Sequence, residues 1–213
     1  MSLDTGICNL AISHIGVGKT ISNANTESSE EAITCRVFYE IALKATLRDC
    51  EWPFATELVT LGLITANPSD DWGYSYTYPP TAVKIRHIYS GVRKDSLQSQ
   101  VEYKIYAGSS SREIYCDLSG AKAETTKYIE NTAFYPDDFK LAFSYRLANY
   151  LVPKLSRGDQ FNIKKELFAL YEDELSMAQA NSFNEIKSGD EVNSEFVRAR
   201  EGNTDEFKRY GNW

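Results

Sequence analysis

The chain has 213 residues and a mass of 24.1 kDa, which is enough for one large domain or two small ones. Hydrophobic residues make up 42% and charged residues 25% of it, a composition typical of a folded protein. No apolar run approaches the roughly 20 residues of a membrane-spanning helix, and residues 1–16 lack the basic start of a signal peptide. We therefore expect a soluble, intracellular chain without a membrane partner.

The net charge of −7 is spread unevenly along the chain. Residues 1–80 carry 4 basic and 10 acidic side chains, residues 81–150 carry 10 and 8, and residues 151–213 carry 9 and 12. Non-specific binding to nucleic acid depends on clustered Lys and Arg. Because no segment supplies such a cluster, we expect no tight binding to nucleic acid.

The four cysteines, Cys8, Cys35, Cys50 and Cys116, are separated by 27, 15 and 66 residues and form no C-x-x-C pair. This spacing indicates neither a disulfide framework nor a zinc cluster. We predict reduced thiols that serve mainly in packing, and no cofactor.

Two amphipathic helices are predicted near the N-terminus, over residues 7–15 and 28–49. The second begins with the capping-box spacing of Ser28 and Glu31 and is apolar on more than one face, which predicts more than one packing partner. It must end near Trp52 because Pro53 cannot continue it. We predict that Trp52 and Phe54, which flank Pro53, anchor the junction with the next part of the chain.

The central part changes to the two-residue period of strands. Residues 83–89 and 101–106 alternate, which predicts strands with one buried face, and Ser90-Gly91, Gly108-Ser109 and Ser119-Gly120 are placed for turns. The pattern predicts a meander of antiparallel strands from about residue 56 to 130. Asp70-Asp71 and Tyr78-Pro79-Pro80 mark a loop after the first strand.

Helical spacing returns after residue 135. One helix runs from Phe139 toward Leu151, where Pro153 is expected to break or kink it, and Asp159 can cap the next. The buried stripe predicted for that last helix consists of Leu167, Leu170, Tyr171, Leu175 and Ala178. The polar tail after it carries only widely spaced aromatic residues and is expected to form an arm.

These patterns predict an α+β fold in which N- and C-terminal helices form one bundle around a central antiparallel β meander. The expected parts are bundle helices at 1–55, a β-rich insertion at 56–131, further bundle helices at 132–181 and an extended C-terminal arm at 182–213.

Motifs for catalysis or phosphate binding are incomplete. Gly16-Val17-Gly18-Lys19-Thr20 resembles a phosphate loop, but Ser13 stands where the motif needs glycine, and a helix rather than a strand precedes it. Gly73-Tyr74-Ser75-Tyr76-Thr77 ends in threonine instead of the final glycine of a nucleophile elbow, and we expect an aromatic loop there.

The titratable residues also favour packing over catalysis. His14 and His87 are the only histidines, and each lies on the apolar stripe of its element, so a core or interface histidine is favoured over a catalytic base. The acidic groups Asp70-Asp71, Asp137-Asp138 and Glu172-Asp173-Glu174 are interpreted as a loop, a helix N-terminus and a solvated helix face. No catalytic or metal-binding residue is predicted, and the chain is not expected to be an enzyme.

An ordered set of short segments resembles the head-to-tail adaptors of short-tailed bacteriophages, the tail tubular protein A family. The segments, which span roughly Gly6 to Ala180, are Ile7-Cys8-Asn9-Leu10-Ala11 with Ile15-Gly16; Glu27, Ala32, Cys35 and Tyr39; Trp52-x-Phe54-Ala55; Tyr76-x-Tyr78-Pro79; Val83-Lys84-Ile85-Arg86; Tyr128-Ile129; and Phe139-x-x-Ala142 with Leu147-Ala148. The chain departs from the family at Pro53, where asparagine is frequent, and after Ala180.

The resemblance implies a non-enzymatic virion component: a ring, usually of twelve subunits, that joins the portal at the capsid vertex to a downstream tail tube or nozzle protein. Genomic DNA would pass through its channel without specific binding, and the acidic N-terminal residues 1–80 suggest negative charge toward that channel. The family's C-terminal region contributes to portal attachment, which makes Phe207, Tyr210 and Trp213 the candidate docking residues. A small binding or regulatory module, and less so an enzyme of unfamiliar type, remain the alternatives.

Overall fold

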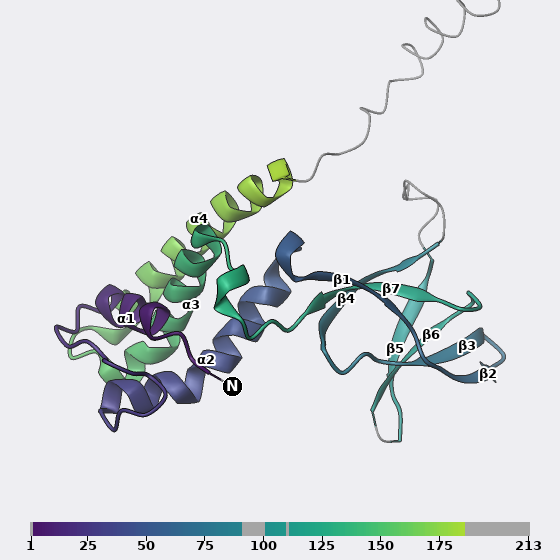
Figure 1. Cartoon of the computed structure of the whole chain (residues 1–213), viewed down its shortest axis with the longest axis horizontal. Helices are drawn as coiled ribbons and strands as arrows, with labels where there is room; N and C mark the ends of the chain where they lie inside the picture. The colour runs from purple at the N-terminus through teal and green to yellow at the C-terminus, as the bar shows by residue number, and fades with distance from the viewer. Residues whose placement is uncertain (1, 91–100, 110, 186–213) are drawn as a thin grey trace, which may run out of the picture. The chain divides into compact units, whose positions relative to one another are not determined.

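A computed structural model describes residues 2–90, 101–109 and 111–185 of the chain (Figure 1). In this part of the chain, helices form a bundle and strands form two antiparallel sheets, which confirms the α+β class. The helices are α1 (Thr5–His14), α2 (Glu30–Asp49), α3 (Asp137–Leu155) and α4 (Gln160–Glu185), with short 3-10 turns η1 (Pro53–Ala55) and η3 (Thr132–Phe134). The strands are β1 (Thr56–Thr60), β2 (Leu63–Ser69), β3 (Trp72–Thr77), β4 (Ala82–Tyr89), β5 (Tyr103–Ala107), β6 (Arg112–Cys116) and β7 (Lys122–Lys127).

Side-chain caps start α1, α2 and α4, because the first N–H groups of a helix have no partner within it. An Asp4 carboxylate oxygen accepts from the N–H groups of Gly6 and Ile7 at the start of α1. The cap of α2 is Ser29 rather than the predicted Ser28, since the helix begins one residue later. Asp159 caps α4, as predicted.

The bundle helices alternate in direction. Contacts between α2 and α3 join Glu30 to Lys154 and Phe38 to Tyr150, and Trp52, just after α2, packs on Phe139, so the two helices are antiparallel. Contacts between α3 and α4 join Asp138 to Asn181, Asn149 to Lys164 and Pro153 to Gln160. Helix α4 is therefore antiparallel to α3 and runs in the same direction as α2.

The two sheets share one hydrophobic core, separate from the core of the bundle. Their strand orders are β1-β7-β4 and β2-β3-β6-β5. The predicted antiparallel pairing is thus present, but the sequential order of a meander is not. The strand at the centre of the first sheet, β7, comes last in the chain and pairs with both β1 and β4.

Strands β4 and β5 do not show the predicted alternation of buried and exposed residues. In β4 the buried residues are Ala82, Ile85 and Ile88, because register shifts at two points reverse the side that faces the core. Ile88 is therefore buried, whereas His87 and Tyr89 are only partly covered. The predicted buried face of β5 is wrong as well: β5 is an edge strand, and Ile105 is exposed.

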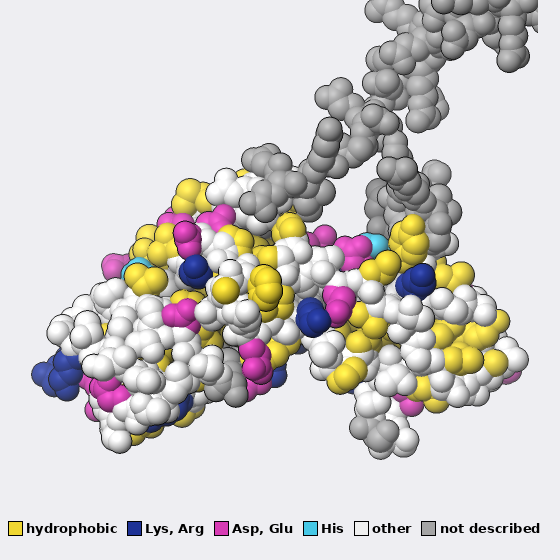
Figure 2. Space-filling model, viewed as in Figure 1, with side chains coloured by type: hydrophobic (Ala, Val, Ile, Leu, Met, Phe, Trp, Pro, Cys, Tyr) yellow, Lys and Arg dark blue, Asp and Glu magenta, His cyan; other side chains and the backbone are white. Residues whose placement is uncertain are grey.

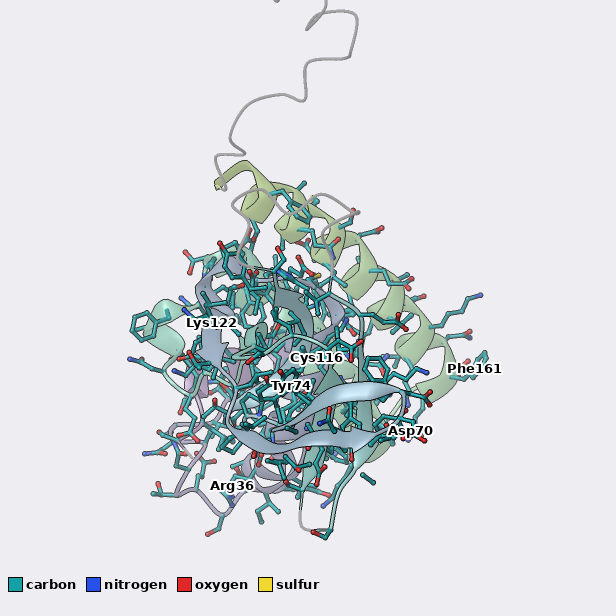
Figure 3. The ribbon with its side chains drawn as sticks, turned by 90° about the vertical axis from the view of Figure 1, so that its right-hand side faces the viewer. Arg36, Asp70, Tyr74, Cys116, Lys122 and Phe161 are labelled. Atoms are coloured by element: carbon teal, nitrogen blue, oxygen red, sulfur yellow. The ribbon has the colours of Figure 1, made fainter. Side chains whose placement is uncertain are left out.

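The aromatic segment 73–77 is a strand and not the loop that we expected. It lies in β3, which pairs with β2 on one side and β6 on the other. Asp70 and Asp71 form the tight turn of the β2–β3 hairpin, at whose tip Asp70 is seen in Figure 3. Hydrogen bonds to β2 and β6 hold this segment as a strand, and the local sequence does not reveal these distant partners.

Two further expectations need correction in the C-terminal helices. Helix α3 continues past Pro153 to Leu155, because the proline lies in its last turn. In α4, Leu167, Tyr171 and Ala178 are buried, but Leu170 is exposed. Helix α4 itself extends to Glu185. Residues 186–213, with Phe207, Tyr210 and Trp213, lie outside the described residues.

We predict that Trp52→Ala lowers the free energy of unfolding by about 3 to 5 kcal/mol, as for other large aromatic side chains removed from a core. The indole is fully buried in the bundle core. Urea unfolding of Trp52→Ala and of the control Phe134→Ala, which removes an exposed ring, tests this. An unchanged midpoint for Trp52→Ala would contradict the anchoring role.

Candidate functional site

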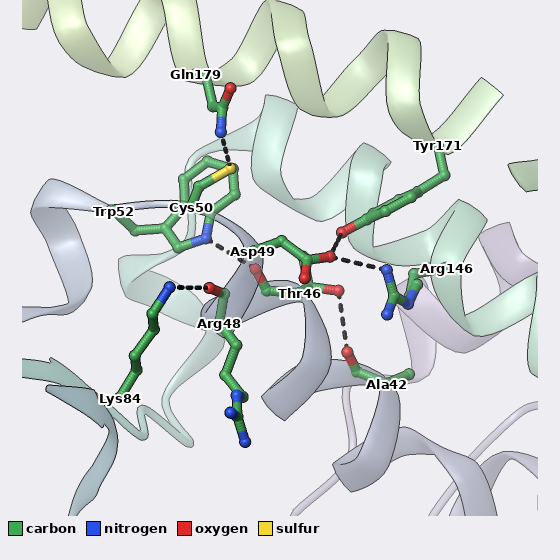
Figure 4. Close-up of polar contacts among 10 residues, drawn as sticks. All are labelled: Ala42, Thr46, Arg48, Asp49, Cys50, Trp52, Lys84, Arg146, Tyr171 and Gln179. Atoms are coloured by element: carbon green, nitrogen blue, oxygen red, sulfur yellow. Dashed lines mark hydrogen bonds and ion pairs between the residues drawn. The ribbon is translucent and has the colours of Figure 1, made fainter. Parts of the chain in front are cut away.

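Strand β4 meets the bundle at the C-terminal end of α2. The guanidinium of Arg86 donates hydrogen bonds to the carbonyl oxygens of Leu47, at 3.1 Å, and Cys50. The ammonium of Lys84 donates to the carbonyl of Arg48 at 3.4 Å (Figure 4). The last carbonyls of a helix lack partners within it and carry partial negative charge. Two cations from one strand therefore satisfy the end of α2.

Arg86 is also tied to its own sheet, because its Nε donates to Thr126 Oγ1 at 2.6 Å. Burial lowers the pKa of Arg86 from its ordinary value, yet a guanidinium stays charged in proteins. The side chain thus links β4, β7 and α2 as a cation. The alternation of residues 83–89 puts Arg86 on the side of the strand opposite Ile85 and does not indicate this contact.

A second polar cluster joins the helices (Figure 4). The Tyr171 hydroxyl of α4 donates to Asp49 Oδ2 at 2.5 Å, and Arg146 of α3 contacts the same oxygen at 2.8 Å. The guanidinium of Arg146 also lies 4.8 Å from the centre of the Tyr171 ring. Burial, and then the hydrogen bond to Asp49, raise the pKa of Tyr171. The hydroxyl therefore remains a neutral donor.

The predicted junction residues lie beside these clusters. Trp52 is fully buried and its Nε1 donates to the carbonyl of Thr46 at 3.1 Å. The rings of Trp52 and Phe54 contact the ring of Phe139 in α3, with centroid distances of 4.8 and 4.9 Å. Pro53 begins the 3-10 turn that follows. Both aromatic rings thus pack on the bundle core, and Arg86 and Lys84 make the polar contacts from β4 to α2.

His14 is held in a structural hydrogen bond. Ser144 donates its hydroxyl proton to the carbonyl of Leu141 at 2.7 Å, so it must accept from Nε2 of His14, which is 2.9 Å away. The imidazole stacks on Tyr145 with a centroid distance of 3.9 Å. Burial lowers the pKa of His14, which favours the neutral donor. His87 contacts Glu124 at 3.5 Å.

All four cysteines are buried free thiols, as predicted. A hydrogen bond with Cys35, and then burial, raise the pKa of Cys8. Burial raises the pKa of Cys50 to about 11. A reactive thiol needs a lowered pKa and access to solvent, so Cys8 and Cys50 are suited to packing.

The residues suspected of chemistry do not converge on one another. Ser75 is buried in the middle of β3 rather than exposed at an elbow, and its hydroxyl has no hydrogen-bond partner. Asp137 and Asp138 lie in the first turn of α3, and Glu172 and Asp173 are exposed on α4. Within the described ranges, no three of the His, Cys, Asp and Glu side chains are grouped to hold a metal ion.

The Gly16–Thr20 segment follows α1 and borders a cleft of about 560 Å³. Lys19 pairs across it with Glu31 at 3.4 Å, and Lys154 approaches Glu30 at 4.0 Å. A phosphate group needs hydrogen-bond donors and positive charge around it, whereas Glu30 and Glu31 place carboxylates in this cleft. The cleft is therefore unlike a phosphate site, as the incomplete motif in the sequence predicts.

A smaller cleft of about 390 Å³ lies beside the C-terminal half of α2. Its charged lining residues are Lys44, Arg48 and Arg112, with no carboxylate among the residues that line it. Lys44 is paired with Glu40 at 2.5 Å, and Arg112 stacks on the Tyr78 ring at 3.7 Å. The lining of this cleft therefore carries an excess of positive charge.

The outer faces of α2 and α4 carry apolar side chains. On α2, Ile33, Val37 and Ile41 are 42, 58 and 54% exposed and recur every fourth residue. On α4, Phe161 and Phe168 are 78 and 44% exposed, and Figure 3 shows Phe161 projecting away from its helix. Figure 2 also shows hydrophobic side chains on the surface of both the helices and the sheets. Such faces are typical of surfaces that associate with other molecules.

Comparison of the chain with protein-family models and with curated proteins gives no match. The adaptor resemblance therefore stays a prediction from the sequence. In the part of the chain that the structure describes, no helix is both long and apolar enough to cross a bilayer.

We predict that Arg86→Met lowers the free energy of unfolding by about 1.5 to 3 kcal/mol, because it leaves buried carbonyls without a charged donor. Arg86→Lys, which keeps the charge but loses the fork, should lose less. Urea unfolding of both, with exposed Lys122→Met as the control, measures this. Equal losses for Met and Lys would show that the charge alone contributes nothing and that the forked geometry accounts for the whole loss, whereas an unchanged midpoint for Arg86→Met would contradict the stabilising role of Arg86.

The lowered pKa of His14 predicts a pH effect on stability. As pH falls through the ordinary histidine value of about 6.5, the unfolded chain takes up a proton before the folded chain does. The stability advantage of the wild type over His14→Gln should therefore be fully present at pH 8 and smaller at pH 5. Urea unfolding of both proteins at the two pH values measures it, and an advantage that grows on acidification would contradict it.

Proposed function

We propose that the chain is a structural virion protein, the subunit of a head-to-tail adaptor ring that joins a portal to the tail of a short-tailed bacteriophage. The ordered adaptor-like segments carry this proposal. In the fold, Cys8, Ala32, Trp52 and Phe139, from four of the segments, belong to one bundle core. Segments that pack together in one core would keep their order and spacing in any chain with this architecture.

Self-association is supported by the exposed apolar faces of α2 and α4. The two faces belong to different helices, so a contact between them is heterologous, and a heterologous contact that closes on itself makes a ring. The portal would bind one end of the ring, and a tail tube or nozzle protein the other.

DNA passage is supported by the net charge of −7. A channel wall with excess negative charge repels phosphate, so it does not retain the moving duplex. The basic cleft beside Arg48 would face a protein neighbour in this arrangement and not the channel.

The test is the mass of the full-length protein mixed with the portal from the same particle. We expect a portal-bound assembly with many copies, twelve if the ring follows the resembling family, and no turnover of substrates. A monomer that stays unbound, or particles with one or two copies, would contradict the adaptor function and favour a regulatory binding module.

A further inference from the structure

The outer faces of α2 and α4 carry matched side-chain patterns. Both helices place four residues at intervals of four, three and four, which lie along one side of a helix. These residues are Ile33, Val37, Glu40 and Lys44 on α2, and Phe161, Lys165, Phe168 and Glu172 on α4. We name these two sets the α2 stripe and the α4 stripe.

Both stripes lie away from the core of their own subunit. The buried side of α2 contains Ala32, Cys35, Tyr39 and Ala42, and the stripe lies on the opposite side of the helix. On α4, the stripe flanks the buried residues Leu167, Tyr171 and Ala178. The apolar members of both stripes are substantially exposed, and Lys165 and Glu172 are exposed as well.

We propose that the α2 stripe of one subunit packs in parallel against the α4 stripe of the next copy of the same chain. The inference rests on the proposed ring and names its subunit contact. In this register Ile33 lies level with Phe161 and Lys44 lies level with Glu172. Apolar side chains meet at the N-terminal ends, and opposite charges meet at the C-terminal ends.

The two stripes are complementary in charge. In the parallel register, Glu172 joins Lys44, and Lys165 lies about one helical turn from Glu40, so two cations and two carboxylates form one network. The antiparallel register pairs Lys165 with Glu40 and Phe168 with Val37, but it places Glu172 level with Ile33 and close to Glu30. Charge therefore favours contact between the two stripes in either direction.

The fold of a single subunit sets the direction of the pairing. Helices α2 and α4 run the same way within one subunit, because α3 is antiparallel to both. When the bundle axis lies along the ring axis, rotation from one subunit to the next keeps these directions. The α2 and α4 helices of neighbours are then parallel.

Disulfide trapping in the portal-bound assembly tests the register, and the four native thiols are buried. In Ile33→Cys with Phe161→Cys, the parallel register brings the new thiols level, whereas the antiparallel register separates them by about 16 Å along the helix axis, eleven residues at 1.5 Å each. Ile33→Cys with Glu172→Cys is the matched pair, level only in the antiparallel register. A disulfide needs the two Cα atoms within about 7 Å.

We expect oxidation of the first pair to give a ladder of covalent oligomers, and the second pair and each single variant to give none. A ladder from the second pair would overturn the parallel register. A cross-linked dimer from Ile33→Cys alone would show that α2 pairs with α2. If the wild-type mass shows a ring but neither pair cross-links, this contact is wrong while the adaptor function stands; if no ring forms, the adaptor function itself fails.

A charge exchange gives a second readout. Lys44→Glu and Glu172→Lys should each raise the subunit concentration needed for half-maximal assembly by about fivefold, the upper range for one exposed ion pair. The double variant should recover most of this loss, whereas Lys122→Glu, on β7, should leave assembly unchanged. Failure of the double variant to recover would overturn the Lys44–Glu172 contact.

Discussion

The carbonyl end of α2 is the constraint on which the arrangement of helices and sheets depends. A helix that ends beside a sheet leaves polar carbonyl groups, and a buried carbonyl without a donor is costly. Arg86 and Lys84 provide donors from one strand, and Arg86 is fixed in turn by Thr126. The chain leaves the helix at the same place, where Trp52 is buried. The covalent and the non-covalent connections between the two parts therefore coincide at one helix end.

The same helix end organises the bundle. Asp49, the last residue of α2, accepts hydrogen bonds from both Tyr171 and Arg146, and so fixes α4 and α3 against α2. A carboxylate at a helix C-terminus opposes the partial negative charge there. The cation and the neutral phenol around it offset that repulsion. Three helices thus meet at a position that would be unfavourable for Asp49 in an isolated helix.

Local patterns predicted the helices well because each has a continuous apolar stripe, and α1, α2 and α4 also begin with a polar cap. Local patterns failed where contacts with residues far away in the sequence determine the structure. The register shifts in β4 arise from its pairing with β7 and are invisible in the alternation of residues 83–89. Likewise, Arg86 looks like any exposed strand residue until α2 lies beside it. Asp49 and Tyr171 are 122 residues apart, so no spacing rule joins them, and the sequence indicates only that residues 28–49 are apolar on more than one face.

The division of α2 into occupied faces has a consequence for sequence variation. One side of the helix fills the core, its last turn offers carbonyls to β4, and its outer side carries Ile33, Val37 and Ile41. Few positions on it are then free to drift, since a substitution on any side disturbs one neighbour. An edge strand such as β5 has four of its five residues exposed, so it can accept change. Among related chains, α2 should evolve slowly and β5 rapidly, although neither contains a catalytic group.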